Sequence, residues 1–267
     1  MPKRTRDEWS QAPAAPTVAT TLASSSLLDA WREQLTLHSA SSEPVWVQSP
    51  RRGTLVGETL ALLDERLIYA IAGVELWAQR RPASSAMHLH FDVDEEHARH
   101  TSADEPLRCP ATSVILYISD AGGPTLLLEQ RPRDAWRASV SCHACWPRAG
   151  QLMAFPGDWL HGVVPADGAS ATEERVTVVL NLWARKPLGV PALRARDVPK
   201  ASEAPPRARS PPRERDWAEA DDAWRWRSLS VGMRDRTSTA ELLMPPLVSS
   251  GAAMERFTAR CRVQKDS

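Results

Sequence analysis

The chain has 267 residues, of which 42% are hydrophobic and 25% charged, as expected of a globular protein with one core-forming domain and tails. Basic and acidic residues number 33 each, so the overall charge gives no indication of a nucleic-acid partner or of attraction to an anionic membrane. No apolar run reaches the roughly 18–20 residues that a membrane-spanning helix needs, and there is no secretory signal pattern. We therefore expect a cytoplasmic protein, with the nucleus as an alternative because Lys3–Arg6 is a basic cluster.

The N-terminal third combines a tail, two helices and two strands. Residues 1–23 are rich in Ala, Thr, Ser and Pro without periodicity, which predicts a disordered tail. Helical spacing of apolar residues follows a serine-rich cap at 26–35 and recurs at 60–71. Val45–Val47 is predicted to be a short strand, and the alternating run Val74–Gln79 a longer one.

The middle of the chain is rich in predicted strands. Short apolar runs, separated by turns that contain glycine and proline, lie at Met87–Asp92, Ala111–Ile118, Thr125–Glu129, Gln151–Phe155 and Arg175–Trp183. Short strands at this spacing predict an antiparallel sandwich or a jelly roll. The fold class is therefore α+β, mainly β.

The composition changes after Lys186. Residues 187–216 are rich in proline and arginine, which indicates a stiff, solvated linker. Residues 217–230 carry three tryptophans among charged residues and are predicted to contain a short helix. The expected organisation is thus a domain at 24–186, the linker, and a partly helical appendage at 217–267 that is a candidate binding segment for a protein partner.

One short segment suggests a metal site. Side chains alternate between the two faces of a strand, so His90 and Asp92 are expected to project from the same side. Two histidines and one carboxylate on one face of a metal leave three adjacent coordination positions open, an arrangement that suits non-haem iron(II). The third ligand candidate is His161, which follows the Pro156–Gly157 turn at the start of a strand.

A strand that begins with an arginine follows His161. In Arg175–Trp183, Arg175 and Thr177 share one face of the predicted strand, while Val176 and Val178 share the other. A buried guanidinium needs a partner, and a carboxylate offers it a planar two-point match. Thr177 can add a hydroxyl group to the same carboxylate.

These residues resemble the iron(II)- and 2-oxoglutarate-dependent dioxygenase superfamily, and most closely its prolyl 4-hydroxylase-like branch. The resemblance covers roughly residues 74–186 and lies in four blocks in the family's order: His90–Asp92, Ala111–Thr125, Phe155–Gly162 and Arg175–Thr177. The second block, which contains a Gly-Gly-Pro-Thr segment, is the most specific. One departure is that prolyl 4-hydroxylases have a lysine where this chain has Arg175.

The resemblance implies a double-stranded β-helix, which is a jelly roll, with N-terminal helices packed on its outside. It implies that His90, Asp92 and His161 bind Fe(II), and that Arg175, Thr177 and Thr125 bind the co-substrate 2-oxoglutarate. The expected reaction is hydroxylation of a small molecule or a peptidyl side chain, with release of succinate and carbon dioxide. Ascorbate is a further candidate cofactor.

Two alternatives stay open. His88, His90, Glu95 and His161 could form the metal site of a cupin-type dioxygenase or isomerase, although this interpretation leaves Asp92 without a role. The other alternative is a non-catalytic jelly roll that only binds a partner.

The four cysteines, in a chain without a secretory signal pattern, are expected to be free thiols. Cys142 and Cys145 have the spacing of a zinc or redox pair, but no second pair exists. We expect a loop with two incidental thiols there.

Overall fold

The structure is a computed structural model that describes residues 18–37, 43–68, 71–102, 105–134, 139–165, 172–201, 214–216, 225–233, 236–245 and 254–263. The helices are α1 (Ser25–Leu37), α2 (Leu55–Leu60) and α3 (Glu95–His100), with short 3-10 turns at Glu65–Leu67 and Ala195–Asp197. The strands are β1 (Ala19–Leu22), β2 (Val45–Gln48), β3 (Gly73–Pro82), β4 (Met87–His90), β5 (Thr112–Tyr117), β6 (Thr125–Leu128), β7 (Ser139–Cys145), β8 (Gln151–Pro156), β9 (Leu160–Val163), β10 (Glu174–Trp183), β11 (Glu214–Asp216), β12 (Arg225–Met233), β13 (Arg236–Met244) and β14 (Met254–Val263).

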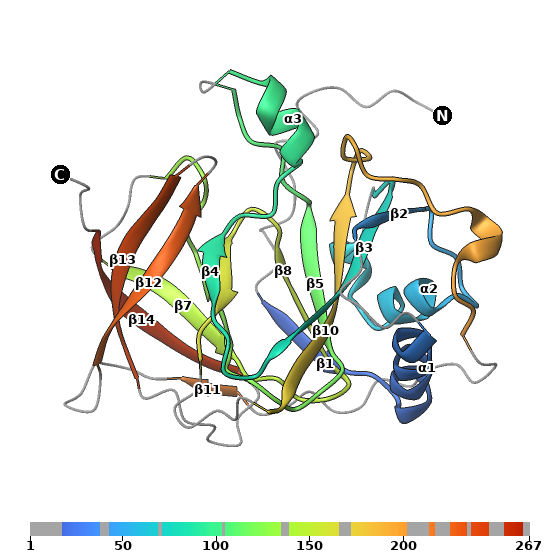
Figure 1. Ribbon diagram of the computed structural model, residues 1–267, viewed down its shortest axis with the longest axis horizontal. Coiled ribbons are helices and arrows are strands. Elements are labelled where there is room, and N and C mark those ends of the chain that lie inside the picture. The colour runs from blue at the N-terminus through green and yellow to red at the C-terminus, as the bar shows by residue number, and fades with distance from the viewer. Residues whose placement is uncertain are drawn as a thin grey trace.

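Two sheets face each other at the centre of the molecule (Figure 1). The six-stranded sheet has the order β1-β8-β5-β10-β3-β2, and the opposite layer consists of β4, β9, β6 and β7, here called the shared strands. From β3 to β6 the chain crosses between the two layers at every step, and it does so again from β7 to β10. This winding is the double-stranded β-helix, so the fold class predicted from the sequence is confirmed.

The space between the sheets is filled by apolar side chains from both layers. The six-stranded sheet contributes Ile115, Tyr117, Met153, Phe155 and Val179, the shared strands contribute Leu127 and Cys145, and the turn before β9 contributes Trp159. Strand alternation produces this arrangement, because Val179 points inward while its neighbours Val178 and Leu180 point outward to the helices. Arg175 and Thr177, on the same face as Val179, are therefore also directed between the sheets.

The outer face of the six-stranded sheet is covered by α1 and α2. Trp31 of α1 is buried, and its indole nitrogen donates a 2.9 Å hydrogen bond to Thr59 of α2. The first predicted helix is confirmed, but the second, expected at 60–71, is wrong. Helix α2 instead begins at Leu55, where Thr54 caps its N-terminus by accepting a hydrogen bond from the Gly57 amide, and it ends at Leu60.

The disorder predicted for residues 1–23 is wrong for the part that the structure describes. Ala19–Leu22 forms β1 and pairs with Gln151–Ala154 of β8, at the edge of the six-stranded sheet. The polar residues that suggested disorder fit here because an edge strand exposes much of its length. Residues 1–17 of the predicted tail lie outside the described residues.

Residues 187–201 pack on the domain, where the sequence predicted the start of a linker. Backbone hydrogen bonds join Trp46 to Pro191 and Leu193, and Ala201 to Gly53. Val198 belongs to the apolar core beneath the helices. The prolines of this stretch thus lie in an extended segment that backbone hydrogen bonds join to β2. The predicted domain boundary at residue 186 is therefore wrong. Residues 202–213 lie outside the described part of the chain.

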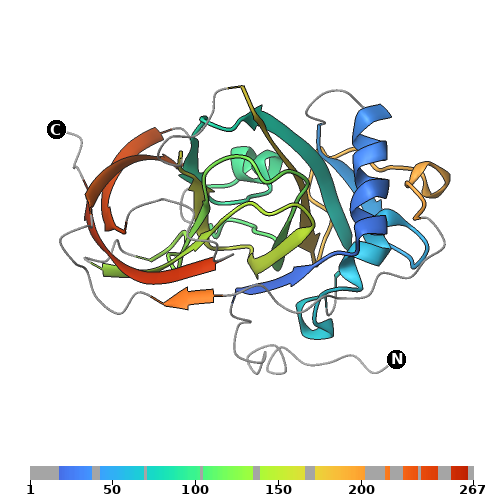
Figure 2. The ribbon, with the colours of Figure 1, turned by 90° about the horizontal axis from the view of Figure 1, so that it is seen from below.

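The C-terminal region forms strands, and the helix predicted at 217–230 is wrong where the structure describes it. β12 pairs with β13 and β13 with β14, and this C-terminal sheet joins the shared strands at two places. β12 lies parallel to β4, and β14 pairs antiparallel with β7 over Ser139–Cys145. Figure 2 shows the resulting closed ring of strands beside the double-stranded β-helix.

This closed barrel explains why the region is not helical. Its interior is filled by Val231, Ala240, Leu242, Met244, Phe257 and Ala259, which pack on Leu126, Leu128, Ala144 and Leu160 of the shared strands. Each shared strand therefore has one face toward the double-stranded β-helix and one toward the barrel. Apolar residues at alternate positions of β12–β14 cover the second face and bury it. Trp217 and Trp224, which suggested a helix, lie outside the described residues.

All four cysteines are free thiols, as the sequence predicted. The segment that contains Cys142 and Cys145 is strand β7, where a loop was expected. Because the two residues are three positions apart on a strand, Cys142 faces the barrel and Cys145 faces the double-stranded β-helix. Within the described ranges, no helix is long and apolar enough to cross a membrane.

Candidate active site

Three side chains converge at one end of the shared strands. His90 is the last residue of β4, Asp92 follows two residues later, and His161 lies in β9. One potential ligand atom of each lies within 4.8 Å of the others, a spacing that could hold a metal ion. His90 Nε2 lies 3.7 Å from Asp92 Oδ1, and His161 Nε2 lies 3.6 Å from Asp92 Oδ2. The structure thus brings together the three predicted ligands.

Backbone carbonyls orient both imidazole rings. His90 Nδ1 lies 3.0 Å from the carbonyl oxygen of His88, and His161 Nδ1 lies 3.0 Å from that of Trp159. A carbonyl can only accept a hydrogen bond, so each Nδ1 carries the proton and donates it. Each Nε2 then presents its lone pair toward Asp92 and the shared space. This is the tautomer that a metal ligand needs.

The pairing of β4 with β9 sets the distance between the two histidines. His90 and His161 are directly opposite in the antiparallel register, and their ring centroids are 4.4 Å apart. Gly162 allows this approach, because a Cβ atom there would lie 2.7–2.8 Å from the carbonyl oxygens of Met87 and His88. A residue with a side chain at 162 would push the strands, and the two ligands, apart.

Asp92 is anchored from the opposite sheet. The Ser113 hydroxyl of β5 donates a 2.8 Å hydrogen bond to Asp92 Oδ2. Ser113 is fully buried, and the Asp92 side chain is only 10% exposed. The hydrogen bond fixes one carboxylate oxygen and leaves the other directed toward His90. The sequence analysis did not identify Ser113, although its inward position on a predicted strand is a signal that could have found it.

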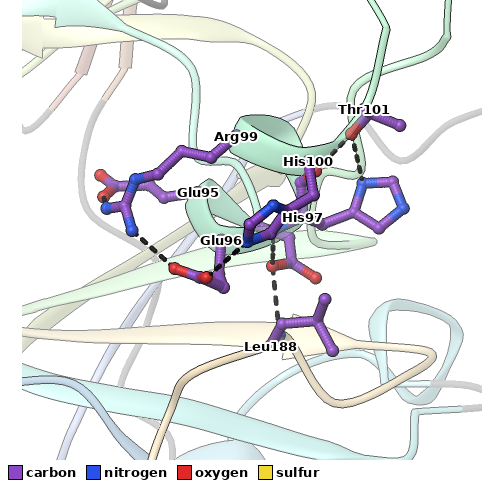
Figure 3. Close-up of polar contacts among 8 residues, drawn as sticks. Glu95, Glu96, His97, Arg99, His100, Thr101 and Leu188 are labelled. Atoms are coloured by element: carbon purple, nitrogen blue, oxygen red, sulfur yellow. Dashed lines mark hydrogen bonds and ion pairs between the residues drawn. The ribbon is translucent and has the colours of Figure 1, made fainter.

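Helix α3 follows the ligand segment directly. Asp94 caps it by accepting hydrogen bonds from the backbone amides of His97 and Leu188, and pairs with Arg108 at 3.0 Å. Figure 3 shows that His97 and His100 make contacts within the helix, to Thr101 and Glu96 respectively. The contacts of Asp94 with Leu188 and Arg108, by contrast, join the segment after Asp92 to two other parts of the chain.

The alternative cupin ligand set is not assembled. Among the described residues, the cluster of ligand atoms contains neither His88 nor Glu95. His88 is exposed on β4, and Glu95 lies on α3, where it pairs with Arg99. The carboxylate that meets the two histidines is that of Asp92, which the cupin interpretation leaves without a role.

A second charged site lies between the sheets. Arg175 is only 5% exposed, and its Nη1 and Nη2 atoms donate 2.7 Å hydrogen bonds to the Gly123 carbonyl and to Thr125 Oγ1. Its guanidinium carbon lies 5.1 Å from the centroid of the Tyr117 ring. Among the described residues none of these partners is a carboxylate, so the buried positive charge lacks a counter-ion.

The surroundings of Arg175 are built closely around its side chain. Gly122 has a φ of +101°, and a Cβ atom there would lie 3.2–3.4 Å from the side-chain carbons of Arg175. Tyr117 Oη and Thr125 Oγ1 are 2.8 Å apart. Thr177 is buried on the same face of β10 as Arg175. Of the residues predicted to bind the co-substrate, Thr125 thus contacts the Arg175 guanidinium and Thr177 shares its strand face. Tyr117, which lies against the guanidinium, was not indicated by the sequence.

Burial shifts two titratable groups near the metal ligands. The pKa of His90 is lowered to about 4, first by burial and then by the charge of the nearby His161. His90 is therefore neutral at pH 7, as a metal ligand must be. The pKa of Glu75 is raised to about 7, mainly by burial, with the charge of Asp92 adding to the effect.

Comparison with known proteins gives only distant likenesses. No protein-family model matches the chain, and no curated protein matches its sequence. Among solved structures, a prolyl-4-hydroxylase from Pseudomonas putida is 17% identical, with a TM-score of 0.41 over 63% of this chain and 85% of the other.

HygX from Streptomyces hygroscopicus, solved with nickel, 2-oxoglutarate and hygromycin B, is 15% identical, with a TM-score of 0.39 over 74% of this chain and 98% of the other. SnoN, a non-heme alpha ketoglutarate dependent epimerase from nogalamycin biosynthesis, is 14% identical, with a TM-score of 0.38 over 73% and 87%. At this level the likenesses decide neither the activity nor the substrate of this chain.

Proposed function

We propose that this protein is an iron(II)- and 2-oxoglutarate-dependent oxygenase of the superfamily that the sequence resembles. The observation that carries the proposal is the presence of two complementary sites between the same sheets. One is a cluster of two imidazoles and a carboxylate, and the other is a buried guanidinium that has no carboxylate partner among the described residues. A 2-oxo acid with a second carboxylate would fit both.

The spacing of the two sites agrees with a short diacid. Thr125, which accepts a hydrogen bond from Arg175, is two residues from Leu127 on β6, and Leu127 is directly opposite His161 on β9. Two residues of strand correspond to roughly 7 Å. In 2-oxoglutarate, three carbons separate the two carboxylates, so one end can pair with Arg175 while the other reaches the metal position.

The donor set at the metal position fits iron(II). Two histidines and one carboxylate on one side leave the remaining positions for co-substrate and oxygen. When bound, the iron would couple the oxidation of a substrate C–H bond to the conversion of 2-oxoglutarate into succinate and carbon dioxide. We propose hydroxylation as the outcome for the substrate.

The residues of the chain contribute binding and orientation. Arg175 would pair with the distal carboxylate of 2-oxoglutarate in a planar, two-point arrangement. Thr125 Oγ1 accepts from Arg175 and is in contact with Tyr117 Oη, so one of the two hydroxyl groups can donate to the same carboxylate. Ser113 and the two backbone carbonyls hold the ligands in place before the metal arrives. Buried apolar side chains from both sheets limit the access of water to this space.

Turnover of 2-oxoglutarate tests the proposal directly. The full-length protein with Fe(II), oxygen and 2-oxoglutarate, with and without ascorbate, should form succinate at a slow rate even without its substrate. Asp92→Ala should abolish this rate, and His88→Ala, beside the site but outside the ligand set, should retain it. A wild-type protein that binds iron but forms no succinate and does not bind 2-oxoglutarate would overturn the proposal.

A further inference from the structure

One side of the double-stranded β-helix is open. On the inner face of β3, Glu75, Trp77, Gln79 and Arg81 are all partly exposed, although their outward neighbours Val74, Leu76 and Ala78 are buried. The inward residues of the adjacent strand β10 are buried. The inward residues of β5 and β8, the next strands in the sheet, are buried as well. Solvent therefore reaches the interior along β3 and not along β10, β5 or β8.

Strand β4 forms the other wall of this opening. β3 and β4 follow each other in the chain and belong to the two facing layers, and no hydrogen bonds pair them among the described residues (Figure 1). The inward residues of β4 are His88, which is exposed, and His90, whose side chain is 25% exposed. We call the partly exposed inner faces of these two strands the β3–β4 opening. One of the proposed metal ligands, His90, lies on its wall.

We propose that the β3–β4 opening is the substrate site, and that it recognises a substrate with a primary or secondary ammonium group through Glu75 and Trp77. This inference rests on the proposed function, because it supplies the substrate class for the same metal site. The shared chemistry is an alkylammonium group, which can belong to a free small molecule or to a peptidyl lysine.

Glu75 is the residue that carries this inference. Its Oε2 accepts a 2.9 Å hydrogen bond from the Trp183 indole, so one carboxylate oxygen is fixed and the group is directed rather than freely solvated. Among the described residues Glu75 has no cationic partner. An ammonium group is the ligand that would compensate a partly buried carboxylate in this position.

Asn181 provides a second acceptor next to Glu75. The two residues are directly opposite in the pairing of β10 with β3, so their side chains lie on the same face. Asn181 is 1% exposed, and its Oδ1 atom is buried without a hydrogen-bond partner among the described residues. A buried acceptor without a donor is costly, and an N–H group of the substrate would satisfy it.

Trp77 and Arg81 make the two ends of the β3–β4 opening differ in their affinity for a cation. Trp77 follows Glu75 on the same inner face and is partly exposed, so its indole ring can cover an ammonium group held by the carboxylate. Arg81 lies toward the other end of β3, directly opposite the buried Arg175 in the pairing of β3 with β10. A cation is therefore favoured near Glu75 and disfavoured near Arg81.

The electrostatics at Glu75 support this assignment. The pKa of the Glu75 carboxyl is raised to about 7 by burial and by the charges of Asp92 and Asp94. A nearby positive charge stabilises the ionised form of a carboxyl group whose pKa is raised in this way.

Another pocket, of about 490 Å³, lies between Pro106–Ala111, Arg131–Asp134 and the Pro156–Asp158 turn. Its charges are already compensated, because Arg131 pairs with Asp158 at 3.0 Å and its backbone amide donates to Asp134. None of the three proposed metal ligands lines it. For these reasons we assign the ammonium group to the β3–β4 opening.

Equilibrium binding of defined probes tests the assignment. The full-length protein is loaded with Ni(II) and 2-oxoglutarate and titrated calorimetrically with 1,5-diaminopentane, spermidine and a blocked Gly-Lys-Gly peptide. The neutral counterparts are 1,5-pentanediol and the same peptide with norleucine. At least one amine should bind about tenfold or more tightly than its neutral counterpart. Preference for the diamines over the peptide, or the reverse, identifies the source of the ammonium group.

The variants place the amine in the structure. Glu75→Gln, which keeps the shape of the side chain, should abolish the preference for the amine. Trp77→Leu should weaken amine binding by about three- to tenfold. Glu174→Gln, on the outer face of the same sheet, and Asp158→Asn, in the other pocket, should leave it unchanged. Retained Ni(II) binding shows that each variant is folded.

Any of three results would overturn the assignment. The first is that no amine binds more tightly than its neutral counterpart. The second is that Glu75→Gln keeps the preference, and the third is that Asp158→Asn removes it. Titration with 2-oxoglutarate alone separates this inference from the proposed function. If 2-oxoglutarate binds and the amines do not, the substrate class is wrong and the proposed oxygenase stands; if 2-oxoglutarate fails to bind, the proposed function is wrong.

Discussion

Ser113 of β5 donates a 2.8 Å hydrogen bond to Oδ2 of Asp92, and this bond joins the six-stranded sheet to the carboxylate that follows β4. The two residues are 21 positions apart in the chain. Because both side chains are largely buried, the bond is poorly accessible to water. Asp92 is thus placed by both layers of the fold, while His90 and His161 are placed by the shared strands alone.

Ser113→Ala should weaken iron binding about 10- to 100-fold, since the group that orients a metal-ligating carboxylate would be lost. A competition titration between the protein and a chelator of known affinity measures the change. Thr112→Ala is the control, because the Thr112 hydroxyl donates to the Leu67 carbonyl on the outer face and has no path to the ligand. Equal iron affinity in Ser113→Ala and the wild type would show that the hydrogen bond does not position Asp92.

His90→Ala, Asp92→Ala and His161→Ala should each lose bound iron, because each removes one of three ligands. His88→Ala is the matched control, since His88 is on the same strand and face as His90 but outside the cluster. Metal content after dialysis, measured by elemental analysis, gives the result. If His88→Ala released iron and Asp92→Ala retained it, the cupin ligand set would have to be reconsidered.

The predicted site residues could be found from the sequence because local pattern places them. His90 and Asp92 belong to one short segment, and Arg175 and Thr177 share one face of an apolar strand whose period of two is plain in the sequence. A strand at His161 was also expected, and it is β9 (Leu160–Val163). The strand that was missed is β7, although Val140, Cys142 and Ala144 alternate with polar residues and face the barrel. Its two cysteines, spaced as in a zinc or redox pair, led to the interpretation as a loop.

The C-terminal strands escaped prediction for a different reason. β12 carries arginine and serine between its apolar positions, and in isolation this pattern is as compatible with a charged helix as with a strand. What decides between them is the exposed apolar face of the shared strands, which lies more than 60 residues away in the chain. Long-range partners of this kind override local propensity. Ser113 and Glu75 were missed for the same reason, because their roles depend on residues brought to them by the fold.

Arg175→Met should keep iron and lose 2-oxoglutarate. Removing one member of a buried, charge-assisted pair costs about 2–5 kcal/mol, or roughly 30- to several thousand-fold in affinity. Arg175→Lys should retain part of the binding, because lysine keeps the charge without the planar fork. The weak visible absorption band that appears when a 2-oxo acid chelates Fe(II) without oxygen measures both. An unchanged midpoint for the band in Arg175→Met would remove the main support for the proposed co-substrate.

The stability of the metal-free protein should depend on Glu75 and on pH. The pKa of this carboxyl is raised from 4.5 to about 7 in the folded protein, so the folded state binds the proton more tightly than the unfolded state. The contribution of Glu75 to the free energy of unfolding is therefore fully present below about pH 4.5 and is lost as the pH rises through about 7. Glu75→Gln, which resembles the protonated group, should match the wild type at pH 5.

At pH 8 Glu75→Gln should be more stable than the wild type by about 1–2 kcal/mol, a figure reduced for the partial exposure of the side chain. Urea unfolding at the two pH values measures the difference. The carboxylate of Glu174 is exposed and paired with Arg80. The difference in free energy of unfolding between Glu174→Gln and the wild type should therefore be the same at pH 5 and pH 8. A Glu75→Gln protein equally stable relative to the wild type at both values would show that the pKa is not raised.

Truncation after Ala201 should destabilise the whole protein, because β12 and β14 cover and pair with the strands that carry the metal ligands. The deletion would expose Leu126, Leu128 and Leu160, which are fully buried against the C-terminal strands. Burying a leucine side chain contributes about 1.5–3 kcal/mol, so three account for about 5–9 kcal/mol, comparable to the whole free energy of unfolding of a typical domain. The truncated chain should be insoluble or fail to bind iron. Deletion of 264–267, beyond β14, is the control and should leave both solubility and the melting temperature unchanged. A soluble, monomeric truncation that binds iron like the full chain would show that the double-stranded β-helix folds without the barrel, and that the C-terminal strands have a separate role.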